Sequence, residues 1–318
     1  MTDIVNTSNN VPQIIDSGFK IYTMSKFMET KLKPLVYLID PLVPECGVSL
    51  LYAERGAGKT FMALSLACAA ASGFDFLNFK VPAPCKVLYI DGEMDAREIQ
   101  SRLSLLIKGF EKEGKTVNQE NLRLFLFGMQ NGVTMPNLAI KEEQLAVEKE
   151  IADAQLIIID NISCLYTSYG KENEHNTWIQ YNEWSREQRG KGRAVLWCHH
   201  CGKDKNRGPR GSSSIENILN YSMALSVPEE HTADQGLCVT VSYAKSRGKG
   251  DDSVKEFCAK LVSPPDNSYL QWQMSSTTRQ KQTKQVQKLQ KDGMSLQEIS
   301  KFLGISKSTA QRMSKESA

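Results

Sequence analysis

The stretch LLYAERGAGKTFMALSLACAAASG, residues 50–73, is the most informative part of the chain, because it joins an apolar run, a glycine-containing turn and an alanine-rich segment with the pattern of a helix. A strand that leads through a tight turn into a helix presents unpaired backbone N–H groups at the positive end of that helix. Such an end suits a phosphate group. Lys59 and Thr60, at the expected start of the helix, narrow the prediction to a nucleotide polyphosphate with its magnesium ion.

The turn carries a nearly complete phosphate-binding loop pattern, Gly-x-x-x-x-Gly-Lys-Ser/Thr. It reads AERGAGKT here, with Ala53 in the place of the first glycine. In this pattern the lysine reaches the β and γ phosphates of ATP, and the threonine binds Mg²⁺. The residues expected around the nucleotide are Ala53, Gly56, Ala57, Gly58, Lys59, Thr60 and Phe61.

Length and composition indicate an ordinary water-soluble protein. The 318 residues are 41% hydrophobic and 24% charged, and they suffice for one large domain with a small appendage. No apolar run approaches the roughly 20 residues that cross a bilayer, and the polar start MTDIVNTSNN differs from a signal peptide. We therefore expect a cytoplasmic protein with no membrane partner, whose eight scattered cysteines are reduced thiols.

Near-continuous apolar runs alternate with helical patterns along the chain. The runs VLYID, LRLFLF, LIIID, AVLWC and YSMALSV are typical of strands that are buried on both faces of a sheet. Their alternation with helices predicts an α/β fold with a mainly parallel sheet. We expect a disordered segment at 1–18, an ATPase domain at 19–273 that ends after SPPDNS, and a linker with a small all-α unit at 274–318.

Acidic residues follow two of the expected strands, at the edge where parallel sheets place ligands. Asp160 ends LIIID and is expected to hold Mg²⁺, with a helix cap as the alternative. Glu93 follows VLYID and is the candidate base for the water that attacks the γ-phosphate. Asp91, two residues earlier, is the competing candidate.

Together these motifs resemble a family. The segments VLYIDGEMDAREIQSR and LIIIDNISCL are similar to the glutamate and magnesium-site strands of the DnaB-type replicative helicases, and DnaB proteins share the alanine at the first loop glycine. HHCGKD and RGSSSIEN resemble both DnaB and, in the paired histidines, the plasmid-encoded RepA helicases. The resemblance covers about residues 35–260. It implies a RecA-like P-loop core of the AAA ATPase kind that uses ATP and Mg²⁺ and assembles into a ring, and the likeness to RepA leads us to expect a hexamer.

The resemblance also implies roles for residues outside the loop. His200 corresponds to the γ-phosphate sensor, with His199 as the alternative. YAKSRGKG resembles the Lys-x-Arg element that reaches a neighbouring subunit's ATP site, which implicates Lys245 and Arg247, with Arg210 as the rival arginine. Basic loops that face the channel of such a ring would follow single-stranded DNA through Lys171, Lys203, Lys205, Arg207 and Arg210.

A C-x-x-C pattern at Cys198 and Cys201 is half of a zinc site at most. No second pair of ligands at a usable spacing accompanies it, and a strand would point the two cysteines to different faces. We therefore expect reduced core cysteines here.

The carboxyl-terminal segment is a separate basic unit. Residues 279–318 hold nine basic and three acidic side chains, a net charge of +6, whereas the whole chain carries +3. The pattern GMSLQEISKFLGISKSTAQRMSK predicts a helix, a tight turn and a second helix that begins near Ser306, as in a helix-turn-helix. Its second helix would contact duplex DNA through Lys307, Ser308, Gln311 and Arg312, and a small protein-docking bundle is the alternative.

Two functions of different classes follow. The first is a RepA-like ring helicase or translocase that acts on DNA in the replication of a plasmid, phage or other mobile element. The second is an ATP-switched DNA-binding regulator or loader that assembles on DNA without unwinding it.

Overall fold

The computed structural model describes residues 20–165, 175–201, 217–228, 236–246, 254–275 and 278–315. The chain divides into two units, residues 1–35 and residues 36–318. The first unit contains the short helix α1 (Met24–Glu29), whose cap residue Thr23 accepts a hydrogen bond from the backbone N–H of Lys26. The unit that contains the nine described strands of the main sheet begins at Val36, and the segment 1–18 lies outside the described residues.

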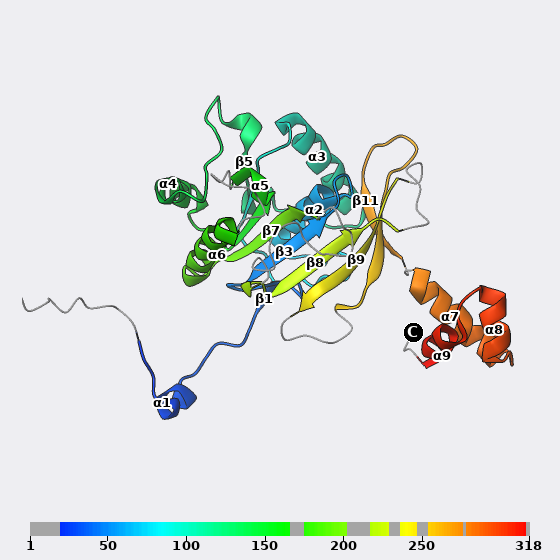
Figure 1. Ribbon diagram of the computed structural model, residues 1–318. Helices are drawn as coiled ribbons and strands as arrows, with labels where there is room; N and C mark the ends of the chain where they lie inside the picture. Colours follow the sequence, from blue (N-terminus) through cyan, green and yellow to red (C-terminus); the bar gives the residue numbers. More distant parts are fainter. Residues whose placement is uncertain are drawn as a thin grey trace, which may run out of the picture. The chain divides into compact units, whose positions relative to one another are not determined.

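The second unit is built on a sheet in which nine strands are described, in the order β11-β10-β9-β8-β3-β7-β6-β4-β5 (Figure 1). Six neighbouring strands are parallel and three are antiparallel, which confirms the predicted α/β fold with a mainly parallel sheet. The parallel strands are β3 (Val48–Ala53), β4 (Val87–Asp91), β5 (Leu122–Leu126), β6 (Leu156–Asp160), β7 (Ala194–His200) and β8 (Tyr221–Ser226). The antiparallel strands are β9 (Leu237–Ser246), β10 (Phe257–Val262) and β11 (Gln271–Ser275), and a separate small sheet pairs β1 (Tyr37–Ile39) with β2 (Val43–Pro44).

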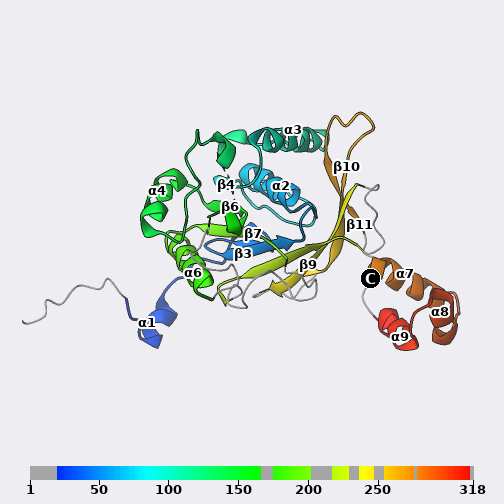
Figure 2. The same cartoon turned by 45° about the horizontal axis from the view of Figure 1, so that its top comes forward.

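The central strands are apolar throughout because both of their faces are covered. All residues of β3, β4 and β6 are buried, and successive side chains alternate between two hydrophobic clusters. One cluster includes residues of α2 (Lys59–Ser72) and α3 (Ala96–Lys112), which lie on one side of β3 and β7 in Figure 2. The other includes residues of α4 (Lys141–Ile151), α5 (Ile162–Leu165) and α6 (His175–Gly190).

The parallel pairing brings the carboxyl ends of four strands to one edge of the sheet. Asp91 at the end of β4 is in register with Asp160 at the end of β6. His200 at the end of β7 is in register with Ala53 at the end of β3. The phosphate-binding loop leaves β3 at this edge, so the topology gathers the predicted site residues there.

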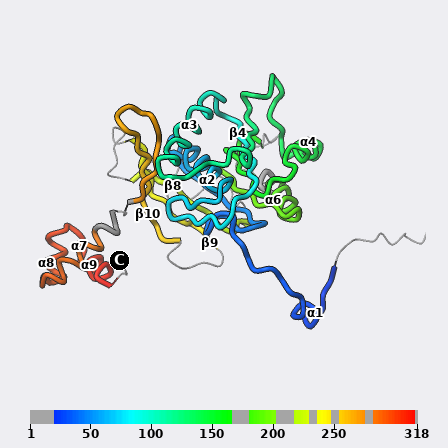
Figure 3. Tube along the Cα trace, turned by 180° about the vertical axis from the view of Figure 1, so that it is seen from behind, coloured from blue at the N-terminus to red at the C-terminus, as the bar shows by residue number. Residues whose placement is uncertain are grey.

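The antiparallel hairpin of β10 and β11 extends the sheet beyond the sequence-predicted domain boundary. The segment SPPDNS is its turn, and the turn lies beside α3 in Figures 2 and 3, where the N–H of Leu270 donates to the carbonyl of Leu105. The indole N–H of Trp272 in β11 donates to the Ser65 hydroxyl on α2 over 2.9 Å. The boundary at 273/274 therefore falls inside β11, and the strand ends at Ser275.

Three helices follow the sheet, namely α7 (Thr278–Lys291), α8 (Leu296–Leu303) and α9 (Lys307–Lys315). Val286, Ile299, Ala310 and Met313 form their shared core. A capping box between Ser295 and Glu298 starts α8, and Gly304 ends it with a φ of 66°. This is the helix, turn and helix that the sequence predicts; a DNA-binding role for them stays a prediction.

Two short 3-10 helices, η1 (Gln119–Asn121) and η2 (Phe127–Met129), flank β5.

Within the described ranges, no helix combines the length and the apolar character that crossing a membrane requires.

Candidate nucleotide-binding site

The loop between β3 and α2 has the backbone shape that the pattern predicts. Gly56 and Gly58 adopt positive φ angles of 78° and 82°. A Cβ at Gly58 would lie 2.5 Å from a methyl carbon of Leu237, so both the backbone angle and the space there require glycine. Ala53 ends β3 in an extended strand, which explains why alanine is accepted in the place of the first glycine.

Asp160 is the centre of a compact polar cluster at the start of α2. Its Oδ2 atom accepts hydrogen bonds from the Thr60 hydroxyl over 2.6 Å and from the Tyr89 hydroxyl over 3.1 Å. The Lys59 ammonium lies 3.7 Å from its Oδ1 atom. Asp160 and Lys59 are both buried, so their opposite charges are poorly screened and hold the cluster together.

The two acids after β4 differ in their surroundings. Asp91 is only 1% exposed, and its Oδ1 atom accepts from the backbone N–H groups of Glu93 and Met94 over 3.0 and 2.7 Å. Burial raises the pKa of Asp91 to about 6. Glu93 is exposed and lines the cavity described below. This arrangement favours Glu93 over Asp91 as the base, because Asp91 is engaged in fixing the turn.

His200 lies between the loop lysine and the strand β6. Its Nδ1 atom is 3.4 Å from Lys59 Nζ, and its Nε2 atom is 3.3 Å from the Nδ2 atom of Asn161. Burial lowers the pKa of His200, and the neighbouring Lys59 lowers it further. The ring is therefore neutral around pH 7 and can exchange hydrogen bonds without adding positive charge beside Lys59.

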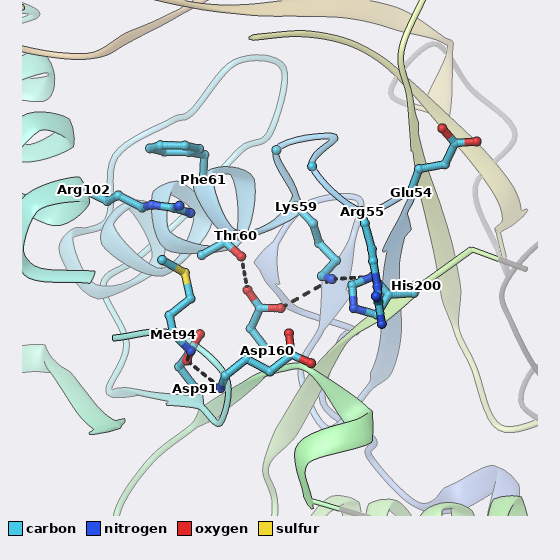
Figure 4. A pocket seen from close by; sticks show the side chains of 13 residues that line it. Glu54, Arg55, Lys59, Thr60, Phe61, Asp91, Met94, Arg102, Asp160 and His200 are labelled. Carbon is cyan, nitrogen blue, oxygen red and sulfur yellow. Dashed lines mark hydrogen bonds and ion pairs between the residues drawn. The ribbon is translucent and has the colours of Figure 1, made fainter. Parts of the chain in front are cut away.

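A cavity of about 520 Å³ opens over this cluster (Figure 4). Arg102 on α3 and Phe61 on α2 form one part of its wall, with the guanidinium carbon 4.6 Å from the ring centroid. Figure 4 shows these two side chains on the opposite side of Thr60 from Lys59 and His200. The lining residues are Glu54, Arg55, Gly56, Gly58, Lys59, Thr60, Phe61, Asp91, Glu93, Met94, Arg102, Asp160 and His200.

The donor set fits a magnesium nucleotide. The Thr60 hydroxyl and the Asp160 carboxylate supply oxygen ligands of the kind that Mg²⁺ prefers, and phosphate oxygens and water complete such a shell in proteins. Lys59 adds a positive charge for a phosphate. The planar Arg102 guanidinium and the Phe61 ring offer flat surfaces of the kind on which a nucleobase stacks.

The structure brings together most, but not all, of the predicted site residues. The cavity is lined by eight of them, namely Gly56, Gly58, Lys59, Thr60, Phe61, Glu93, Asp160 and His200. Ala53 and Ala57 do not, because their side chains are buried in the core beneath the loop. His199 is fully buried, so His200 is the one that reaches the cavity.

Lys245, near the end of β9, does not line this cavity. Cys198 packs in one core cluster and Cys201 against the other, so the two cysteines lie on different faces of the sheet. Six further predicted residues lie outside the described part of the chain, namely Lys171, Lys203, Lys205, Arg207, Arg210 and Arg247.

Sequence reasoning missed several residues of the site. Tyr89 and Asn161 read as strand and helix-cap residues, and Arg102 reads as one charge on an amphipathic helix. Only the packing of α3 against α2 shows that Arg102 faces the cavity. No local spacing in the sequence identifies Arg102, because Glu93 precedes α3 and the two residues do not share a helix face.

Comparisons with known proteins identify the family and a similar fold. The model of the family described as "AAA domain" matches residues 19–206. A KaiC-like protein from the hyperthermophilic archaeon Pyrococcus horikoshii has a similar fold, with a TM-score of 0.51 and 16% sequence identity over 74% of this chain and 93% of that chain. No curated protein matches the sequence.

Proposed function

Because the chain belongs to the AAA domain family of P-loop ATPases, we propose that it hydrolyses ATP and uses the energy as a RepA-like ring helicase or translocase on DNA, in the replication of a plasmid, phage or mobile element. One observation carries the ATPase part of the proposal. Three distant segments of the chain meet at one cavity, which the exposed acid Glu93 also lines. They supply Lys59 with Thr60, Asp160, and His200.

The chain's own residues divide the work of ATP hydrolysis. Lys59 binds and neutralises phosphate oxygens, and the N-terminus of α2 adds its partial positive charge. Thr60 and Asp160 would hold Mg²⁺, which when bound withdraws charge from the β and γ phosphates. Glu93 orients the attacking water and accepts its proton, so that ATP and water give ADP and phosphate.

The ring part of the proposal rests on Lys245 and Arg247. A cation that a neighbouring subunit inserts into the ATP site stabilises the negative charge that develops on the γ-phosphate. The loops that contain Lys171, Lys203, Lys205 and Arg207 follow β6 and β7, the strands that also supply Asp160 and His200. Such loops would contact single-stranded DNA and sense the state of the nucleotide.

The second candidate function is an ATP-switched DNA-binding regulator or loader. It is favoured by α9, on which Lys307, Ser308, Gln311 and Arg312 are all exposed while Ala310 and Met313 are buried. A helix with one buried face and one polar, basic face suits the major groove of duplex DNA.

Strand displacement on a forked duplex tests the proposal. The full chain with ATP and Mg²⁺ should release the labelled strand, and the Lys59→Ala variant should not. ATP hydrolysis without strand release, together with ATP-dependent binding to duplex DNA, would favour the switched regulator.

Subunit mixing tests the ring. An Arg247→Ala subunit keeps its own cavity intact, and a Lys59→Ala subunit keeps its arginine, so mixed interfaces contain one complete site. Mixing the two inactive variants should restore part of the ATP turnover. A fully active monomer at nanomolar concentration would contradict the ring.

A further inference from the structure

We propose that Asn161 is a positioning residue that holds His200 in the tautomer with its proton on Nδ1, so that the ring nitrogen beside Lys59 donates a hydrogen bond to the nucleotide's terminal phosphate. The identity of the acceptor rests on the proposed ATPase function. The tautomer itself rests on contacts within the chain.

The orientation of the Asn161 side-chain amide is fixed by a backbone donor. Asn161 is only 1% exposed, and its Oδ1 atom accepts a 2.9 Å hydrogen bond from the backbone N–H of Ser163. The thiol of Cys164 lies 3.7 Å from the same oxygen. Because a backbone N–H can only donate, the atom that faces it must be the oxygen. The amide nitrogen of Asn161 therefore faces His200.

This orientation determines the chemistry of His200. The Asn161 Nδ2 atom is 3.3 Å from His200 Nε2, and a side-chain NH₂ group donates but does not accept. We assign Nε2 as the acceptor, because this contact is shorter than the 3.4 Å contact between Nδ1 and Lys59 Nζ and because the Lys59 ammonium also has the Asp160 carboxylate 3.7 Å away. The proton of the neutral ring is then on Nδ1. A doubly protonated ring would place two donors against each other at this contact, in agreement with the lowered pKa of His200.

The result is a pair of donors that face the same space. His200 Nδ1 and Lys59 Nζ are 3.4 Å apart, and with the proton on Nδ1 neither atom can accept from the other. Both are satisfied when an anionic oxygen lies between them and accepts from each. A terminal phosphate oxygen has this chemistry, so the pair is built to detect whether that phosphate is present.

Cys164 supports the same arrangement from the other side. A Cβ at Gly92 would lie 2.3 Å from the Cβ of Cys164, so the turn that leads to Glu93 packs closely on this residue. Burial raises the pKa of the Cys164 thiol to about 12, and the neighbouring Glu93 carboxylate also raises it. The thiol therefore stays protonated and available as a weak donor to Asn161 Oδ1. Asn161 thus links the turn of the candidate base to the phosphate sensor.

Nitrogen NMR of histidine rings tests the tautomer directly in the full chain without nucleotide. The chain has four histidines, so the His200 signals can be assigned by their loss in His200→Gln. Wild-type His200 should show the pattern of a ring protonated on Nδ1. Asn161→Asp, which offers an acceptor to Nε2, should move the proton to Nε2. Asn121→Ala is the matched control, because its amide donates to the Ala71 carbonyl instead, and it should leave the pattern unchanged.

Kinetics give a second readout. Asn161→Ala should lower kcat for ATP hydrolysis about tenfold with a smaller change in KM, and in the His200→Gln background it should add almost nothing. A wild-type His200 protonated on Nε2, or an Asn161→Asp variant with an unchanged tautomer, would overturn the inference. The NMR result can hold even if neither the wild type nor any variant hydrolyses ATP. In that case the proposed function fails, and the positioning role of Asn161 stands.

Discussion

The hydroxyl of Thr60, at the start of α2, donates a 2.6 Å hydrogen bond to Oδ2 of Asp160, at the end of β6. Lys59 lies 3.7 Å from the other carboxylate oxygen of the same aspartate. Two neighbouring residues of the loop are therefore both directed at one buried acid. This contact explains how the start of α2 and the end of β6, which are distant in sequence, form one site, where we propose that a magnesium nucleotide binds.

Substitutions at Thr60 should show whether its hydroxyl binds Mg²⁺ or only supports the shape of the loop. Thr60→Ser keeps an oxygen at this position, and Thr60→Val keeps the volume but removes the oxygen. We expect Thr60→Val to require at least tenfold more Mg²⁺ for half-maximal ATP turnover, because one ligand of the ion is lost. Thr60→Ser should stay near the wild-type requirement. Equal Mg²⁺ titrations for the two variants would remove Thr60 from the ion's shell.

Glu93→Gln should bind ATP with wild-type affinity and lose most of its turnover. The change removes the base but leaves the loop, Lys59 and Asp160 in place, and losing a general base costs on the order of 10²–10⁴ in rate. A steady-state phosphate assay together with an ATP-binding titration measures both properties. Asp91→Asn is the comparison, because an asparagine oxygen can still accept from the N–H groups of Glu93 and Met94. Normal turnover in Glu93→Gln with loss in Asp91→Asn would make Asp91 the base.

Asp91 should also make stability depend on pH. Burial raises its pKa from 3.8 to about 6, so the folded chain binds this proton more tightly than the unfolded chain does. Its contribution to stability is therefore present at low pH and is lost as the pH rises from about 4 to above 6. The Asp91→Asn variant lacks this loss. At pH 8 it should exceed wild type in free energy of unfolding by up to about 3 kcal/mol, and at pH 4 the two should be similar. Denaturant unfolding at both values measures the difference, and a parallel pH dependence in the two proteins would contradict it.

The sequence predicted the elements whose signal is local. The apolar runs of β3, β4 and β6 identify buried strands because each residue needs a covering on both faces. The glycines of the loop and the acid at the end of β6 follow from the same pattern. The parallel pairing of β4 with β6 then brings Asp91 beside Asp160, because parallel strands end at the same edge of the sheet.

The remaining parts depend on contacts between distant segments. The sequence predicts a linker from residue 274, and only the pairing of residues 271–275 with β10, together with the contact of Trp272 with Ser65, shows that they form the strand β11. Arg102 joins the site through the packing of two helices, and Asn161 through the meeting of β6 and β7. None of these is encoded in the spacing of nearby residues.

Arg102 should contribute to binding of the nucleotide rather than to chemistry. Its guanidinium stacks on Phe61 at the wall of the cavity, 4.6 Å from the ring centroid. Arg102→Ala should weaken ATP binding about tenfold, since a stacking surface for the base is worth about 1–3 kcal/mol. Turnover at saturating ATP should change little. Lys108→Ala, also on α3 but outside this cavity, is the control. A loss of kcat without a change in affinity would instead place Arg102 at the phosphates.

The polar face of α9 should carry binding to duplex DNA, separately from ATP hydrolysis. Lys307 and Arg312 are exposed on this helix, whereas the nucleotide cavity is lined by residues between Glu54 and His200. The double variant Lys307→Ala/Arg312→Ala should therefore keep ATPase activity that single-stranded DNA stimulates. Its duplex affinity should fall, and the slope of log affinity against log salt should flatten by about 2, because each phosphate contact releases about one counterion.

Lys284→Ala/Lys291→Ala is the matched control for this last prediction, because it removes the same charge from exposed positions on α7. If α9 enters the groove, the α9 variant loses more affinity than the control at every salt concentration, and its loss includes a part that salt does not reduce. Equal losses would mean that duplex binding depends only on net charge. If neither variant affects duplex binding but both lose stimulation by single-stranded DNA, the three helices serve the single strand. Unchanged binding in both assays would favour a protein-docking bundle, since helices with this packed core and polar surface serve either purpose.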